Sequence, residues 1–211
     1  MNLKILSLVI IGVCILLPDV CYAFLSKDVH LLNMQNGLAD NTVSAVYKDK
    51  EGFIWFGTRN GLSRYDGRRI TNFERSRSYP SISNLKEVFD GVLAFVDNGV
   101  FSAFDLKKER FLSVVSSSGQ GIPSRGMLQR NDSLVWVISG SELHLMKRCA
   151  SKEGELRLRV QEKYTGWNNQ DNLLVAITYS SDKKSICLID EKGRIILLDA
   201  TNPVSYTHLR A

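Results

Sequence analysis

The feature that most constrains this 211-residue chain is a strand–turn–strand pattern that recurs about every 40 residues. The segment "IWFGTRNGLSRYD" begins at Ile54, and "LAFVDNGVFSAFD" begins at Leu93, 39 residues later. Both carry Asn-Gly near the middle and end in an aromatic residue followed by Asp. Looser copies, "LVWVISGSELHLM" and "ICLIDEKGRIILLD", begin at Leu134 and Ile186. Repeats of this length are typical of β-propellers, in which neighbouring sheets cover one another's apolar faces.

The first copy predicts a complete propeller blade. An alternating stretch, "TVSAVYKD", precedes the nearly continuous apolar run "FIWFGT", which is typical of a strand covered on both faces. The short "LSRYDG" and the more polar "RRITNFER" follow, with turns at Asn60-Gly61 and Asp66-Gly67, and Asn60-Gly61 can take the positive φ of a tight hairpin. We therefore expect a four-stranded antiparallel meander in which Trp55 and Phe56 pack between blades.

The predicted fold class is all-β: an incomplete β-propeller of about four blades, each a four-stranded antiparallel sheet, over residues 24–202. The alternative is an all-β sandwich whose turns are evenly spaced by coincidence. The end of the chain, "PVSYTHLRA" at residues 203–211, fits no blade pattern and is expected to be a non-native or unstructured tail. An unclosed propeller exposes blade faces and strand edges, so we expect the chain alone to fold poorly.

The first 23 residues predict a secretory signal peptide. Lys4 precedes an apolar stretch from Ile5 to Leu17, and a small-residue site ends at Ala23, after which we expect cleavage. An uncleaved membrane anchor is disfavoured, because a helix of that stretch would rise only about 20 Å against a bilayer core of about 30 Å. A lipoprotein signal at Cys21 is also disfavoured, because the bulky Val20 precedes it.

Composition and charge exclude several functions. The formal charge is +5, but the basic residues are scattered and form no run of five, so we expect solvated faces and no binding of nucleic acid. The three histidines are far apart in the sequence and give no metal-ligand spacing and no local nucleophile pair, so no metal, cofactor or catalytic residue is predicted. Cleavage of the leader would leave Cys149 and Cys187, which could pair, although two separate thiols are favoured.

Residues 36–74, "NGLADNTVSAVYKDKEGFIWFGTRNGLSRYDGRRITNFE", resemble the two-component regulator propeller repeat. The opening "NGLADNTV", the strand "GFIWFGT" and the closing "GLSRYDG" carry this resemblance, whereas the later copies are degenerate. The family forms the periplasmic sensor part of Bacteroides-type hybrid two-component histidine kinases. The resemblance thus implies a sensor that recognises oligosaccharides and regulates glycan-utilisation genes. Its implied partners are an oligosaccharide, the remaining blades and the downstream kinase of a membrane-anchored parent chain, with dimerisation through that parent.

Ligands of propellers usually contact the loops from the outermost strand to the next blade and from the second strand to the third. On that basis the predicted ligand-binding residues are Arg59, Asn60, Arg77, Tyr79, Trp167 and Asn168. Trp167 in "YTGWNNQD" is the sharpest candidate, because an aromatic ring flanked by amides suits a sugar face. The alternative for Trp167 is a ring folded back onto the propeller.

Two other functions fit the same fold. A propeller lyase or hydrolase would need convergent carboxylates or a Tyr/His set, whereas the candidate acids all fall at turns or strand ends, where Asp commonly forms turns. These acids are Asp40, Asp49, Glu51, Asp66, Asp97, Asp105 and Asp199. A protein-binding scaffold is the remaining alternative, because fold alone does not decide function.

Overall fold

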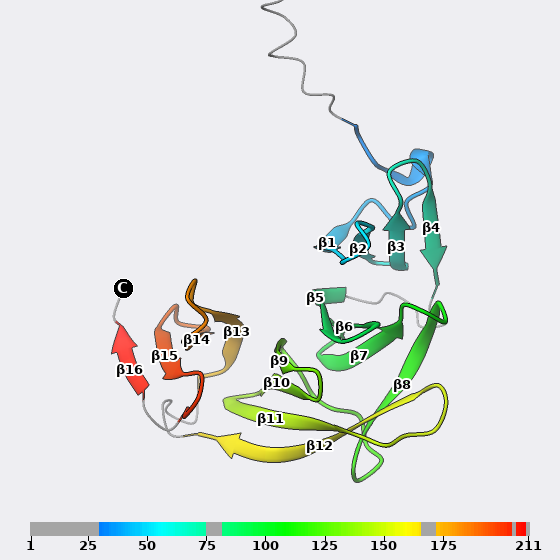
Figure 1. The fold of residues 1–211 in the computed structure, drawn as a ribbon. Helices are drawn as coiled ribbons and strands as arrows, with labels where there is room; N and C mark the ends of the chain where they lie inside the picture. Colours follow the sequence, from blue (N-terminus) through cyan, green and yellow to red (C-terminus); the bar gives the residue numbers. More distant parts are fainter. Residues whose placement is uncertain (1–29, 75–81, 166–171, 204–205, 210–211) are drawn as a thin grey trace, which may run out of the picture. The chain divides into compact units, whose positions relative to one another are not determined.

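The computed structural model describes residues 30–74, 82–165, 172–203 and 206–209 (Figure 1). The chain divides into a unit from Met1 to Leu32 and a compact unit from Asn33 to Ala211. His30 to Leu32, the described end of the first unit, have no regular secondary structure. Every strand lies in the second unit, and the described residues hold one short helix, the 3-10 helix η1 (Met34–Asn36). No described helix has the length and apolar character needed to cross a membrane. The predicted leader lies outside the described residues.

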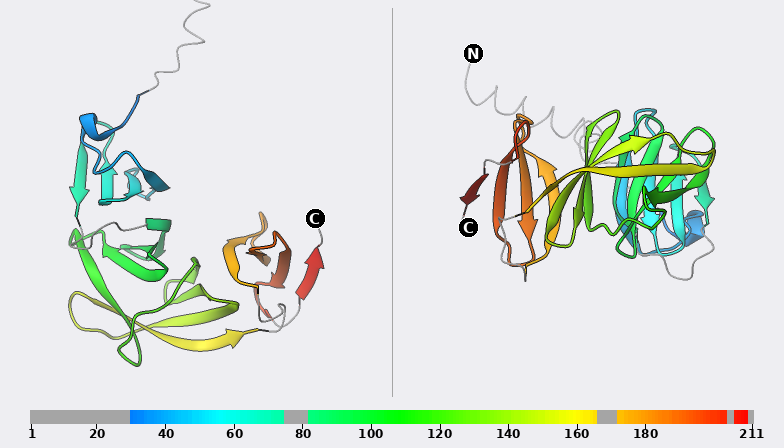
Figure 2. Two further views of the ribbon diagram at one scale, coloured as in Figure 1. Left: turned by 180° about the vertical axis from the view of Figure 1, so that it is seen from behind. Right: turned by 90° about the horizontal axis from the view of Figure 1, so that it is seen from below.

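Each of the four sequence copies forms one blade of a β-propeller, as predicted (Figures 1 and 2). Consecutive strands within a blade pair in antiparallel fashion. Blade 1 contains β1 (Val43–Lys48), β2 (Ile54–Thr58), β3 (Gly61–Tyr65) and β4 (Ile70–Phe73). Blade 2 contains β5 (Ile82–Phe89), β6 (Val92–Asp97), β7 (Val100–Asp105) and β8 (Arg110–Ser116).

The two looser copies form complete blades as well. Blade 3 contains β9 (Gly126–Asn131), β10 (Leu134–Ser139), β11 (Glu142–Cys149) and β12 (Glu155–Tyr164). Blade 4 contains β13 (Leu174–Tyr179), β14 (Ser185–Asp190), β15 (Ile195–Asp199) and β16 (Tyr206–Leu209). Strand β16 falls in the segment expected to be a non-native or unstructured tail, and it pairs with β15.

Three hydrophobic clusters fill the spaces between successive blades, and the alternation of β6 explains how one strand serves two of them. Leu93 and Phe95 join the cluster between blades 1 and 2, while Ala94 and Val96 join the cluster between blades 2 and 3. Successive side chains of a strand point to opposite faces, so a strand between two blades is apolar throughout. A third cluster, which contains Trp136, lies between blades 3 and 4.

Trp55 is the centre of the cluster between blades 1 and 2. Its side chain is 1% exposed and lies 5.6 Å from the Phe73 ring and 5.5 Å from the Phe104 ring of blade 2. The prediction that Trp55 packs between blades is therefore confirmed. Phe56, on the opposite face of the sheet, is half-buried and belongs to none of the three clusters.

Two glycines of blade 1 permit its close packing. A Cβ at Gly57 would lie 2.5 Å from Cγ2 of Ile82, so only glycine lets β5 of the next blade approach this closely. Gly61 has φ +114°, and a Cβ there would lie 2.4 Å from the Phe73 carbonyl oxygen. The positive φ expected for Asn60-Gly61 is confirmed at Gly61 alone.

Blades 2 and 3 are joined more tightly than separate four-stranded blades would be. Their outermost strands, β8 and β12, pair in parallel, so the two blades form one eight-stranded sheet (Figure 2). The pairing covers the outer edge of each blade, which would otherwise expose unpaired N–H and C=O groups. Cys149 on β11 and Cys187 on β14 are separate, half-buried thiols, as favoured from the sequence.

We predict that Trp55→Ala lowers the free energy of unfolding by about 3–5 kcal/mol, the usual effect of truncating a large buried aromatic residue. Urea denaturation provides the measurement. Val46→Ala is the matched control, because Val46 lies on β1 of the same blade and is 62% exposed, and it should change stability by less than about 1 kcal/mol. Equal effects of the two substitutions would show that Trp55 does not hold the blades together.

Candidate functional site

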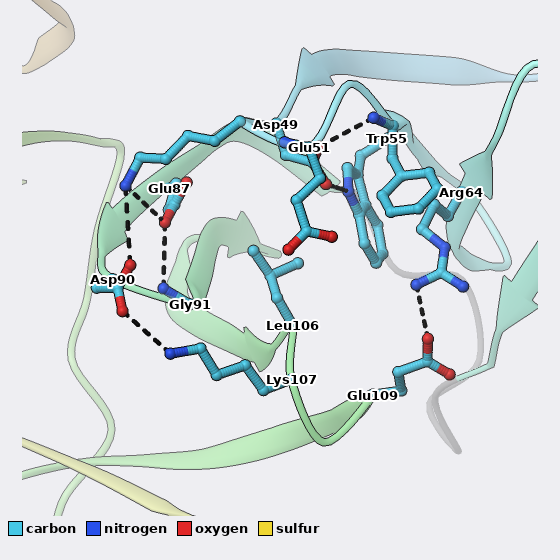
Figure 3. Close-up of a pocket in the computed structure, with 12 residues that line it drawn as sticks. Asp49, Glu51, Trp55, Arg64, Glu87, Asp90, Gly91, Leu106, Lys107 and Glu109 are labelled. Carbon is cyan, nitrogen blue, oxygen red and sulfur yellow. Dashed lines mark hydrogen bonds and ion pairs between the residues drawn. The ribbon is translucent and has the colours of Figure 1, made fainter.

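A pocket of about 500 Å³ opens between the turns of blades 1 and 2 (Figure 3). The β1–β2 turn, the β5–β6 turn and the β7–β8 turn form its walls, and Trp55 and Arg64 lie at its base. We call it the blade 1–2 pocket; it is lined by Asp49, Lys50, Glu51, Phe53, Trp55, Arg64, Glu87, Asp90, Gly91, Leu106, Lys107 and Glu109.

Asp49 shapes the β1–β2 turn that forms one wall. Its Oδ1 accepts hydrogen bonds from the backbone N–H of Glu51 (3.0 Å) and of Phe53 (2.9 Å). Its Oδ2 accepts a 2.8 Å hydrogen bond from Nε1 of Trp55, so the buried carboxylate ties the turn to the interface between blades.

The same turn recurs in blade 4, where it does not line the blade 1–2 pocket. Asp190 Oδ1 accepts from the backbone N–H of Lys192 (3.0 Å) and of Arg194 (2.9 Å), and Oδ2 accepts from Arg194 Nε (2.6 Å). Burial raises the pKa of Asp190, but these hydrogen bonds outweigh it and the net pKa is lowered. Because the arrangement serves a turn in both blades, Asp49 is a structural residue of the pocket. The expectation that Asp49 forms a turn is confirmed.

Ion pairs connect the two blades across the pocket. Lys50 Nζ of blade 1 lies 3.2 Å from Glu87 Oε1 and 3.9 Å from Asp90 Oδ1 of blade 2. Lys107 Nζ also contacts Asp90, at 3.1 Å from Oδ2 (Figure 3). Lys50, Asp90 and Lys107 are each more than 70% exposed, so the pairs order the pocket wall more than they stabilise the fold.

Arg64 covers the aromatic base of the pocket. Its guanidinium carbon lies 4.8 Å from the Phe53 ring centroid and 5.6 Å from that of Trp55. The guanidinium also pairs with Glu109 of blade 2 at 2.6 Å (Figure 3). Cation–π contacts and the ion pair together fix the guanidinium, so a ligand would meet a charged planar group rather than an open aromatic face.

Glu51 is the carboxylate of the pocket that is open to a ligand. Its side chain is exposed and points into the pocket (Figure 3). Within the described part of the chain, Asp49, Glu87, Asp90 and Glu109 each contact an N–H group or a cation, and Glu51 alone of the five acids has no side-chain partner. A carboxylate in this position can accept hydrogen bonds from hydroxyl or amine groups.

Arg59 and Asn60, the two predicted ligand-binding residues that the structure describes, do not line this pocket. Arg59 and Asn60 are exposed on the β2–β3 turn, at the opposite end of β2 from Asp49. The Asn60 side-chain amide donates a 3.1 Å hydrogen bond to the carbonyl of Ala39. The other four predicted residues, Arg77, Tyr79, Trp167 and Asn168, lie outside the described residues, so the ligand-binding role of all six stays a prediction.

Sequence reasoning missed the charged residues that form the pocket. The scattered basic residues, Arg64 and Lys107 among them, were expected to be solvated, and no role was predicted for Glu87. A signal was present for Arg64, because it pairs with Trp55 across the β2–β3 hairpin and therefore shares its face. Glu87 and Lys107 come from the next blade, and no local pattern indicates their contact with blade 1.

Residues 37–60 match the model of the family described as "Two component regulator propeller". The match covers β1, β2 and the turns before and after them, including the Asp49 turn. The chain therefore carries a two-component regulator propeller repeat, as the sequence indicated. No curated protein matches the sequence.

Among solved structures, the fold is similar to two extracellular domains from B. thetaiotaomicron. One comes from a protein assigned as hybrid two component system BT3049, with a TM-score of 0.55, 20% identity, and coverage of 86% of this chain and 26% of that chain. The other comes from a protein assigned as one component system BT4673, with a TM-score of 0.65, 15% identity, and coverage of 86% and 27%. This chain thus spans about a quarter of each of these structures.

An enzyme shares the fold as well. The dihydro-heme d1 dehydrogenase NirN has a TM-score of 0.54 and 16% identity over 82% of this chain and 38% of that chain. At these identities the likeness to all three structures shows the propeller fold, and function has to be argued from the site.

We predict that Lys107→Met raises the pKa of Asp90 toward its ordinary value. The hydrogen bond and charge of Lys107 are the main causes that lower this pKa, with a smaller effect from the charge of Lys50. With a lowered folded-state pKa, the ion pair stabilises above the ordinary carboxyl pKa and is lost as pH falls through the folded value. An NMR titration of the Asp90 carboxyl measures the change. Lys192→Met, which removes an exposed lysine of blade 4, is the control, and an unchanged Asp90 titration in Lys107→Met would contradict the pairing.

Proposed function

Because residues 37–60 match the two-component regulator propeller family, we propose that this chain is part of the ligand-sensing region of a hybrid two-component sensor kinase. The fold shared with two extracellular domains of B. thetaiotaomicron supports this proposal. In this account the chain is exported by its leader and works in the periplasm. The rest of a longer sensor would supply the kinase, the membrane anchor and the contacts for dimerisation.

The proposed ligand is an oligosaccharide, and its binding regulates genes for glycan use. The blade 1–2 pocket is the site in the described residues that we assign to this ligand. Its exposed Glu51 and its ion-paired wall offer acceptors and donors to sugar hydroxyls, and the turns of two blades bring them together.

The arrangement of the carboxylates favours binding over hydrolysis. A glycoside hydrolase of the usual kind needs two carboxyl groups that both face the scissile bond, one as acid and one as base or nucleophile. In the blade 1–2 pocket four of the five acids hold N–H groups or cations in place, which leaves Glu51 for the ligand. The propeller hydrolase is therefore the weaker alternative.

We predict that the 211-residue chain binds at least one oligosaccharide and that Glu51→Gln weakens this binding about tenfold, the effect of losing a hydrogen bond to a charged group. Isothermal titration with cello-, malto-, manno- and xylo-hexaose and with digests of complex glycans provides the measurement. Glu191→Gln is the matched control, because Glu191 lies in the equivalent Asp turn of blade 4 and is also exposed.

Each outcome of this titration has a clear meaning. Binding that Glu51→Gln weakens and Glu191→Gln leaves unchanged supports the sensor proposal and its site. Binding that neither variant changes would place the site elsewhere and overturn the assignment of the pocket. No binding by any sugar to a chain that unfolds cooperatively in urea would contradict an oligosaccharide ligand, and shortened products after incubation would favour the enzyme.

A further inference from the structure

A second pocket, of about 700 Å³, lies where the innermost strands of the blades come together. Tyr47 of β1, Lys86 of β5, Arg130 of β9 and Tyr179 of β13 contribute to its lining, so all four blades take part. The β13–β14 turn adds Lys183. We call it the inner-strand pocket.

A β-bulge places Lys86 in the inner-strand pocket. Ser83 pairs with Val96, but Lys86 pairs with Ala94, so β5 contains one residue more than β6 between these pairs. Asn84, with φ +52°, lies in this irregular stretch. Without the extra residue, Leu85 would lie opposite Ala94, whose side chain faces blade 3. Because of the bulge, Lys86 takes that position instead and faces blade 3.

Lys86 has no acidic partner among the described residues. Its side chain is half-buried, and burial lowers the pKa of its ammonium group. A half-buried cation without a counter-charge is unfavourable, and an anion that entered the pocket would relieve that cost.

Two more cations line the pocket, and neither forms an ion pair within the described part of the chain. The guanidinium carbon of Arg130 lies over the Trp136 ring, 5.1 Å from the ring centroid. Lys183 is exposed on its turn, where it adopts the left-handed backbone conformation with φ +58°.

The inner-strand pocket differs from the blade 1–2 pocket in how its cations are paired with carboxylates. There, each lysine and arginine has a carboxylate within 4 Å. In the inner-strand pocket the acid is Glu87, whose side chain is 7% exposed and whose Oε1 accepts from Lys50 Nζ at 3.2 Å and from the Gly91 backbone N–H at 3.1 Å. Among the residues that the structure describes, the three cations thus have no anion that neutralises them.

We propose that the inner-strand pocket binds a small molecule through an oxyanion, a carboxylate or a sulfate, held by Lys86, Arg130 and Lys183. The planar guanidinium suits bidentate contact with either group, and the two ammonium groups add charge from neighbouring blades. The two pockets share the lining residue Glu87, but the cations of the inner-strand pocket are different ones, and the proposal does not require that the oxyanion belong to a sugar.

Titration of the 211-residue chain at low ionic strength with sodium sulfate, sodium D-glucuronate and D-glucose tests the proposal. We expect sulfate, glucuronate or both to bind, and Lys86→Met to weaken this binding about tenfold, as the loss of one charge-assisted hydrogen bond does. Lys192→Met removes an equal charge on an exposed turn of blade 4 and should change the affinity less than twofold. Binding of one anion and not the other identifies the oxyanion.

The urea midpoint of each variant shows whether a loss of binding comes from a loss of folding. Lys86→Met replaces an unpaired cation with an apolar side chain of similar length, so its urea midpoint should equal or exceed that of the native chain. If it does not, Lys183→Met, at an exposed turn, serves in its place and should also weaken binding.

The proposal is overturned if neither anion binds, if glucose binds as well as glucuronate, or if the variants and Lys192→Met have the same effect. Glu51→Gln should leave sulfate binding unchanged, so a failed oligosaccharide proposal and a failed oxyanion proposal are distinguishable.

Discussion

The burial of Trp55 between blades 1 and 2 is the interaction on which both the fold and the candidate site depend. A four-stranded sheet with two apolar faces is not stable in water alone, so each blade needs a neighbour. Trp55 fills the space between blades with its ring, and its indole N–H holds the Asp49 carboxylate. Asp49 in turn fixes the turn that carries Lys50 and Glu51. The packing between blades 1 and 2 and the geometry of the blade 1–2 pocket therefore both depend on the Trp55 side chain.

The two pockets use charge in opposite ways. Among the described residues of the blade 1–2 pocket, the cations form ion pairs with carboxylates, and Glu51 is the carboxylate left without a side-chain partner. In the inner-strand pocket the cations Lys86, Arg130 and Lys183 have no acidic partner among the described residues. The first arrangement suits the uncharged, hydroxyl-rich ligand that we propose for it, and the second suits the anion that we propose.

The blades were predictable from the sequence because their signals are local. Apolar runs, Gly turns and their spacing of about 40 residues predict the strands of blades 1 to 3, the first three strands of blade 4 and the burial of Trp55. The bulge at Asn84 was not predictable, because the alternation around it favours Leu85 over Lys86 for the inward position. The parallel pairing of β8 and β12 and the strand Tyr206–Leu209 depend on contacts far apart in the chain, which no local pattern encodes.

The pockets were harder to predict for the same reason. Arg64 of blade 1 and Glu87 of blade 2 line the same pocket although they are far apart in the sequence. The sequence also does not distinguish Lys86, a half-buried lysine, from a solvated one. The family resemblance indicated a repeat at residues 36–74, of which residues 37–60 match the family model, but it did not indicate which side chains face a ligand.

Hydrogen exchange of the Trp55 indole N–H tests the central claim most directly. If the ring joins blades 1 and 2 into one cooperative unit, this proton exchanges only on global unfolding, with a free energy equal to that from urea denaturation. Exchange at a clearly lower free energy would show that the interface between the blades opens on its own, and would contradict the account.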